Sequence, residues 1–146
     1  MMEKYSGLRS PYVRIGGLVY FARMLDKIRA MAKGELPAEY RANLGRGFDA
    51  NCCHFLRVDY DKLVERVKQD ESDEEILHWC FDHGRRPSDE DTFVWSEFLR
   101  KRGWSDEITE ILKRRKKESG MIDRSEIETM FAYIDADEGR SVKTDQ

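Results

Sequence analysis

Residues 16–32, GGLVYFARMLDKIRAMA, form the segment that decides the fold of this chain. When the segment is placed on a helix at 100° per residue, its apolar side chains cover an arc of roughly 200°. An ordinary surface helix has an apolar stripe only a little wider than about 100°. We therefore expect one long helix over these residues, central to the domain and packed against neighbours on several sides.

Serine residues followed by acids mark the starts of three further helices. Ser72 and Ser88 each precede acidic residues that fill a first helical turn, and Ser72 with Glu75 matches a full capping box. Ser105 is followed by acids that suit the positive end of a helix dipole. Apolar periodicity predicts the remaining helices over residues 52–57, from 59 or 61 to 67, and from about 125.

These patterns predict an all-α protein. No run of residues alternates convincingly as a strand beside a hairpin signal. Residues 35–51 are punctuated by Pro, Asn and Gly, which indicates a loop with at most a turn of helix. We expect residues 1–140 to form a single compact domain of six or seven helices, orthogonal or bundle-like, and residues 141–146 to be a frayed tail.

The composition excludes several classes of protein. Among 146 residues, 26 Lys and Arg face 29 Asp and Glu, which gives a net charge of −3 and disfavours nucleic-acid binding and polybasic membrane binding. The longest apolar stretch, residues 16–22, is far shorter than the ~20 residues that span a bilayer. Three cysteines, two of them adjacent, make a poor disulfide framework and fit reduced thiols. We expect a cytoplasmic protein.

Several blocks of the sequence resemble one family. They are Leu8-Arg9-Ser10-Pro11, Gly16-Gly17 with Arg23 and residues 26–30, residues 72–79 continuing to Arg86-Pro87-Ser88, and residues 135–140. In these blocks the chain is similar to a bacterial family known as domain of unknown function 5069. The resemblance implies a helical fold and a bacterial cytoplasmic protein, and it leaves the function open.

A cluster of charges on the central helix is the first candidate site. Arg23, Asp26 and Lys27 lie within roughly 100° of arc on a helix that is otherwise mostly apolar. Facing solvent, they would form ion pairs contributing about 0.2–1 kcal/mol each. Covered by another helix, they would leave a cation free to hold an anionic group. With the residues that flank the helix start, the candidate anion site comprises Arg9, Ser10, Arg14, Arg23, Asp26 and Lys27.

A metal site is a weaker hypothesis. Its candidate ligands are Cys52, His54, His78 and Asp82, which would have to converge in space. Adjacent cysteines such as Cys52 and Cys53 cannot easily both coordinate one ion. Buried thiols and an exposed histidine explain these residues better, so we expect neither a metal nor a cofactor.

Two functions remain open from the sequence. The wide apolar face of residues 16–32 and the absence of a catalytic motif favour a non-catalytic binding domain with a protein partner or a second copy of itself. The alternative is a protein or enzyme that takes a small anionic metabolite at the Arg/Asp cluster. The aromatic residues between 79 and 104 are expected in the core, where residues 89–99 and the central helix could also enclose an apolar pocket.

Overall fold

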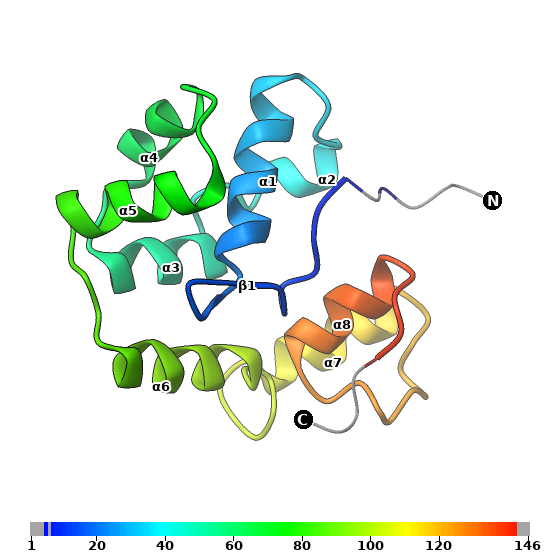
Figure 1. The fold of residues 1–146 in the computed structure, drawn as a ribbon. Helices are drawn as coiled ribbons and strands as arrows, with labels where there is room; N and C mark the ends of the chain where they lie inside the picture. The colour runs from blue at the N-terminus through cyan, green and yellow to red at the C-terminus, as the bar shows by residue number, and fades with distance from the viewer. Residues whose placement is uncertain (1–4, 6, 143–146) are drawn as a thin grey trace.

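The computed structural model describes residue 5 and residues 7–142, which fold into eight helices and one small hairpin (Figure 1). The elements are β1 (Arg14–Ile15), β2 (Leu18–Val19), α1 (Phe21–Ala32), α2 (Ala38–Arg41), α3 (Phe48–Leu56), α4 (Tyr60–Val67), α5 (Asp73–His83), α6 (Asp89–Arg100), α7 (Thr109–Glu118) and α8 (Met130–Asp137). The mostly helical class is confirmed. The predicted count of six or seven helices is low because it leaves out α2, the single turn of helix that the sequence allowed within residues 35–51.

The hairpin corrects the predicted start of the central helix. Gly16 and Gly17 have φ of +57° and +83°, which suits the tight turn that joins the antiparallel strands β1 and β2. The helix begins only at Phe21, after Tyr20 adopts a left-handed conformation at φ +71°. Both residues of β2 are fully buried, so their apolar side chains extended the helical pattern beyond the helix itself.

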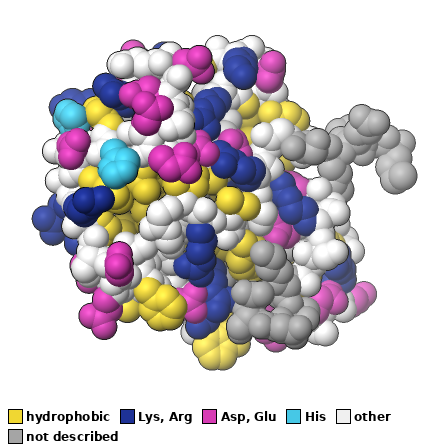
Figure 2. Space-filling model, viewed as in Figure 1, with side chains coloured by type: hydrophobic (Ala, Val, Ile, Leu, Met, Phe, Trp, Pro, Cys, Tyr) yellow, Lys and Arg dark blue, Asp and Glu magenta, His cyan; other side chains and the backbone are white. Residues whose placement is uncertain are grey.

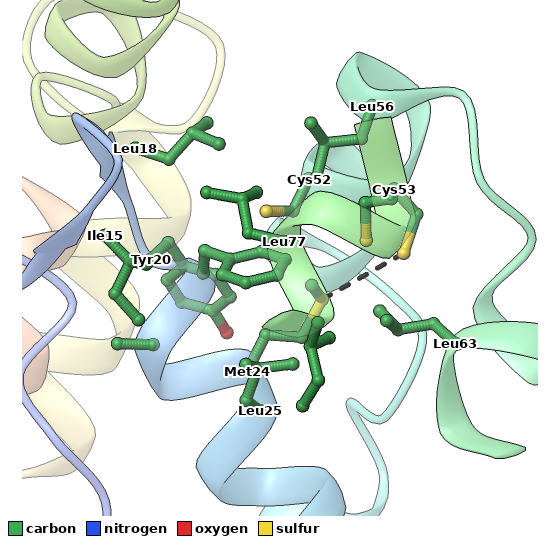
Figure 3. Close-up of a cluster of buried hydrophobic side chains, with 14 of the residues drawn as sticks. Ile15, Leu18, Tyr20, Met24, Leu25, Cys52, Cys53, Leu56, Leu63 and Leu77 are labelled. Atoms are coloured by element: carbon green, nitrogen blue, oxygen red, sulfur yellow. Dashed lines mark hydrogen bonds between the residues drawn. The ribbon is translucent and has the colours of Figure 1, made fainter. Parts of the chain in front are cut away.

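Helix α1 occupies the middle of the fold, as its apolar width predicted (Figure 1). Phe21, Met24 and Leu25 are fully buried, and Ile28 is 3% exposed. They project into one core with side chains from α3, α4 and α5, where all three cysteines also lie (Figure 3). Each such side chain contributes about 1.5–3 kcal/mol when fully buried. The free thiols agree with the expected absence of a disulfide framework among these residues.

Capping explains where most of the later helices begin. Ser72 and Glu75 form the predicted capping box, and Ser88 accepts a hydrogen bond from the Asp91 amide. The helix expected at residue 105 begins at Thr109, because the Asp106 carboxylate accepts hydrogen bonds from nearby backbone amides and holds the preceding residues in turns. The last helix begins at Met130 instead of about residue 125, and the Thr129 hydroxyl caps it by accepting a hydrogen bond from the Ala132 amide.

Helix α6 packs through small residues and turns aromatic ones outward. Thr92 and Ser96 are buried, and the Ser96 hydroxyl donates to the Gly17 carbonyl at 3.1 Å. Phe93 and Phe98 remain 60% and 56% exposed, so the expectation that the aromatic series lies in the core is wrong for them. Other members of the series, Trp79, Phe81 and Trp95, are partly buried and pack against the core. Figure 2 shows hydrophobic side chains on this part of the surface.

No helix among residues 7–142 is long and apolar enough to cross a membrane. Of the predicted frayed tail, residues 143–146 lie outside the described part of the chain.

Candidate functional site

A cavity of about 510 Å³ lies between α1, α2, α3, α7 and α8. Its size is within the range of about 300–1,000 Å³ that is usual for small-molecule sites. Aromatic and aliphatic side chains make up much of its wall: Tyr20, Tyr40, Phe48, Ile108, Ile111, Met130, Tyr133 and Ile134. The ring centroids of Tyr20 and Phe48 lie 5.3 Å apart, so part of this wall is a packed aromatic surface.

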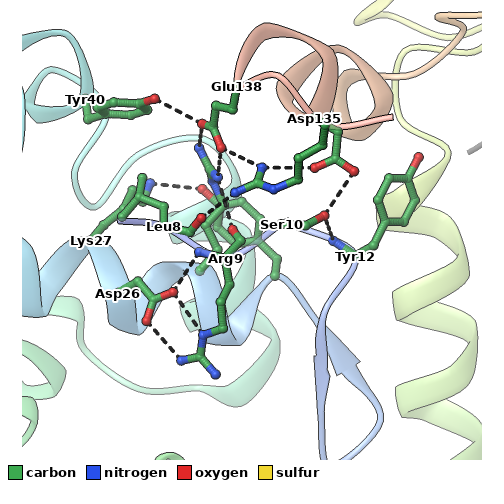
Figure 4. Close-up of polar contacts among 12 residues, drawn as sticks. Leu8, Arg9, Ser10, Tyr12, Asp26, Lys27, Tyr40, Asp135 and Glu138 are labelled. Carbon is green, nitrogen blue, oxygen red and sulfur yellow. Dashed lines mark hydrogen bonds and ion pairs between the residues drawn. The ribbon is translucent and has the colours of Figure 1, made fainter. Parts of the chain in front are cut away.

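A buried ion pair joins α1 to the end of α8 at this cavity. Both guanidinium Nη atoms of Arg23 donate to Glu138, at 2.9 and 2.5 Å, and the two side chains are only 4% and 5% exposed. Tyr40 and Arg140 also donate to Glu138 (Figure 4). Burial alone would raise the pKa of Glu138, but the bonds from Arg23 and Arg140 outweigh it and lower the pKa. The Arg23 Nε atom is buried without a hydrogen-bond partner among the described residues.

A second buried pair joins α1 to α3. The Lys27 ammonium lies 2.7 Å from Asp49 Oδ1 and donates to the Tyr20 hydroxyl at 2.9 Å. The Asp49 side chain is fully buried, and its other oxygen accepts a hydrogen bond from the Gly45 amide. Burial lowers the pKa of Lys27 despite the opposing effect of Asp49, and burial raises the pKa of Tyr20 well above its usual value.

Further cations surround the cavity. Arg102 is paired with Asp106 and Glu107, both at 3.0 Å. Arg46 and Arg115 have exposed side chains, and neither makes an ion pair with a described residue. In total, five basic and three acidic side chains line the cavity, whereas the whole chain carries a net charge of −3. The cavity is therefore a local concentration of positive charge on an acidic protein.

The structure brings only two of the six residues of the predicted anion site to the cavity. Arg23 and Lys27 line the cavity, covered by α8 and α3 instead of facing solvent. Asp26 pairs with Arg9 (Figure 4). Arg9 also donates to Asp73 at 2.8 Å. Ser10 donates to Asp135 at 3.0 Å, and Arg14 lies on the hairpin beside Glu97 at 3.1 Å. Two of the six thus line the cavity. Arg9 lies beside them, since Arg23 donates to its carbonyl at 3.1 Å, but the Arg9 side chain is neutralised by Asp26 and Asp73.

The residues weighed as metal ligands do not converge. Cys52 is fully buried in the core, whereas His54, His78 and Asp82 are exposed. Within the described ranges no group of three His, Cys, Asp or Glu side chains is placed to hold an ion. Burial also raises the pKa of the Cys52 thiol well above its usual value, so it is a poor nucleophile.

A model of the family described as Domain of unknown function (DUF5069) matches residues 5–140. The chain belongs to this family. The match spans every helix and strand from β1 to α8, and it confirms the resemblance seen in the sequence. No curated protein matches the DUF5069 chain.

Sequence reasoning missed the partners that complete the site of this DUF5069 protein. Asp49 lies in the segment read as a loop, and Glu138 lies in the block at residues 135–140 that carried part of the family resemblance. One signal was available. An Arg and a Lys on the inner face of a central helix require counterions when they are buried.

Proposed function

We propose that this DUF5069 protein binds a small organic anion, a carboxylate or phosphate on an apolar body, in the cavity between α1, α3 and α8. The observation that carries the proposal is the free Nε of Arg23. It is a buried donor without a described partner, on a side chain that lines a cavity of ligand size. An unsatisfied buried donor costs about 1–3 kcal/mol, and an anionic oxygen would satisfy it.

The charge around the cavity supports an anionic ligand. Glu138 neutralises one side of the Arg23 guanidinium, but Arg46 and Arg115 add two cations without ion-pair partners among the described residues. Together they make the opening attractive to a negative group and repel a cation of the same size.

The wall of the cavity supports an apolar body on the ligand. Tyr20 and Phe48 pack against each other, and both Met130 and Tyr133 of α8 line the same space. Flat aromatic surfaces of this kind accept a ring or a short hydrocarbon, while the few polar groups fix its orientation.

Three probes of similar size test the proposal by thermal shift and by NMR titration. Phenyllactate and phenyl phosphate carry an anionic group on a ring, and 2-phenylethanol carries the ring alone. We expect both anions to bind and the neutral alcohol to bind much more weakly. Equal binding of all three would contradict the proposal, because the cations would then add nothing.

A matched pair of variants assigns binding to this cavity. Arg115→Gln removes a lining cation, and Arg114→Gln removes an exposed one from the same helix that does not line the cavity. We expect Arg115→Gln to weaken phenyllactate binding about fivefold, close to 1 kcal/mol, and Arg114→Gln to leave it unchanged. Identical affinities in the two variants would place the binding elsewhere.

A second proposal concerns pairing of two copies through α6. The wide face of α1, which first favoured a dimer, is covered within the chain. By contrast, Phe93, Val94 and Phe98 of α6 are 56–60% exposed. The helix begins with three acids and is followed by the exposed Lys101, so two antiparallel copies would set opposite charges against each other. Sedimentation velocity should show a dimer that Phe98→Ser abolishes. A monomer at every concentration would refute this pairing.

A further inference from the structure

We propose that Lys27 forms a covalent, protonated imine with a carbonyl group of the bound anion, which makes the ligand class of this site the 2-oxo acids. The inference rests on the proposed anion binding and extends it to chemistry. It is carried by one arrangement: Lys27 lines the cavity, and its amine is held 2.7 Å from the buried carboxylate of Asp49 and 2.9 Å from the hydroxyl of Tyr20.

The surroundings of Lys27 suit an amine nucleophile. Lys27 is only 4% exposed, and it is one of the residues that line the cavity. Burial lowers the pKa of Lys27, and the nearby Arg23 acts in the same direction. Only a neutral amine has a lone pair to attack a carbonyl carbon, so these effects favour the reactive form. Asp49, fully buried and in contact with the amine, is placed to take up its proton.

The step balances without any oxidant or reductant. The Lys27 ammonium passes one proton to Asp49, and the free amine attacks the carbonyl carbon, so that a C–N bond forms and the carbonyl π pair moves to oxygen. The Tyr20 hydroxyl relays a proton from nitrogen to that oxygen, which gives a carbinolamine. Asp49 then returns its proton to the carbinolamine hydroxyl, which leaves as water while the C=N bond forms.

The product preserves the electrostatics of the site. One ammonium and one carbonyl become one protonated imine and one water, so the positive charge on nitrogen remains. Asp49 is again ionised at the end and keeps a cation beside it, so no uncompensated charge is left in the core. An ordinary buried ion pair satisfies the same rule, but it would not require its lysine to be one of the residues that line a cavity.

The neighbouring arginine explains why a 2-oxo acid fits better than an isolated ketone. Arg23 and Lys27 are four residues apart on α1, so they project from the same face of the helix. A carbonyl at Lys27 would therefore place an adjacent carboxylate near the unpartnered Nε of Arg23. The remaining substituent would extend along the aromatic wall.

Trapping with phenylpyruvate and sodium cyanoborohydride tests the inference on the full chain, followed by peptide mapping by mass spectrometry. Reduction converts an imine into a stable secondary amine on the lysine that formed it. We expect Lys27 to be labelled at least tenfold faster than the exposed Lys33, which serves as an internal reference. Labelling of Lys27 at or below the rate of Lys33 would overturn the inference, and this readout on the unaltered protein needs no variant to fold.

Phenyllactate separates this inference from the proposed function, since it has the same ring and carboxylate but no carbonyl. Binding of phenyllactate without labelling of Lys27 by phenylpyruvate would refute imine formation and leave anion binding intact. Absence of both would refute the two together.

Variants then locate the chemistry. Lys27→Arg keeps the cation beside Asp49 and should abolish the label at that position, whereas Lys33→Arg should leave labelling at Lys27 unchanged. Tyr20→Phe keeps the aromatic ring and removes the proton relay. It should slow labelling of Lys27 about tenfold while phenyllactate binding persists, and an unchanged labelling rate would exclude Tyr20 from the step.

Discussion

Replacing Glu138 with glutamine should destabilise the protein strongly, because its charge is part of a buried ion pair. The substitution keeps the size of the side chain but removes the charge that both Nη atoms of Arg23 contact. Arg23 would remain 3% exposed with no carboxylate to neutralise it. Tyr40 and Arg140 would also lose their charged acceptor.

The magnitude follows from the burial of the pair. Removing one member of a buried ion pair typically destabilises a protein by about 3–5 kcal/mol, because the other charge stays in a medium of low polarity. For a domain of this size that corresponds to a fall of about 10–15 °C in the midpoint of thermal unfolding. An exposed pair would lose no more than about 1 kcal/mol.

Urea unfolding followed by circular dichroism at the helical band provides the measurement, with the denaturant slope checked for constancy. Glu39→Gln is the matched control, since Glu39 also lines the cavity but is exposed. It should change the free energy of unfolding by less than about 0.5 kcal/mol. The double variant Arg23→Met with Glu138→Gln should regain much of the loss, because no uncompensated charge remains. A loss below about 1 kcal/mol in Glu138→Gln at constant slope would refute the reasoning.

Three further predictions concern the rest of the fold. Gly84→Ala places a Cβ 1.9 Å from the Leu56 carbonyl oxygen and should reduce the free energy of unfolding by about 2–4 kcal/mol. Gly120→Ala meets open space and should reduce it by only about 1 kcal/mol, because of the φ of +73° at that position. Equal losses of the two variants in urea unfolding would contradict this prediction. Hydrogen bonds from Arg100 and Arg14 hold the pKa of Glu97 at about 2, below its usual 4.5, although burial acts in the opposite direction. The stabilisation of the folded state by this ion pair is present above the usual pKa and is lost as the pH falls from about 4.5 to 2. Glu97→Gln should therefore be less stable than the unaltered protein by about 1 kcal/mol at neutral pH and equally stable at the acid end of a thermal unfolding series over pH. A difference in stability that stays constant with pH would refute this prediction. Burial raises the pKa of the thiols of Cys52, Cys53 and Cys80. Ellman's reagent should therefore react stoichiometrically with them only after unfolding. Reaction in the native state would contradict their buried positions.

Local patterns predicted the elements that depend on local physics. The spacing of Phe21, Met24 and Leu25 is a property of one helix, and so is the capping box at Ser72, so both could be recognised without any tertiary contact. The hairpin was not predicted because strands of two residues are too short to show an alternation of apolar and polar residues. Its signal was the Gly16-Gly17 pair, which has the residue types of a tight turn.

Only part of the candidate site could be predicted from the sequence. Arg23 and Lys27 stand out because charges on the inner face of a central helix are unusual. Their counterions depend on the tertiary fold: Glu138 is 115 residues away from Arg23, and no periodicity selects it from 29 acidic residues. The cavity itself arises where α2, α3, α7 and α8 meet, and several of its wall residues belong to the segment that the sequence left as a loop.

The pair of Arg23 with Glu138 also bears on how the protein is made. A ribosome adds about 5–20 residues per second, so the arginine exists for roughly 6–23 seconds before its carboxylate partner is synthesised. During that time α1 carries an unneutralised guanidinium on the face that must enter the core. The nascent helix therefore has an electrostatic reason to stay hydrated until the last helix emerges, which delays collapse until the whole set of partners is present.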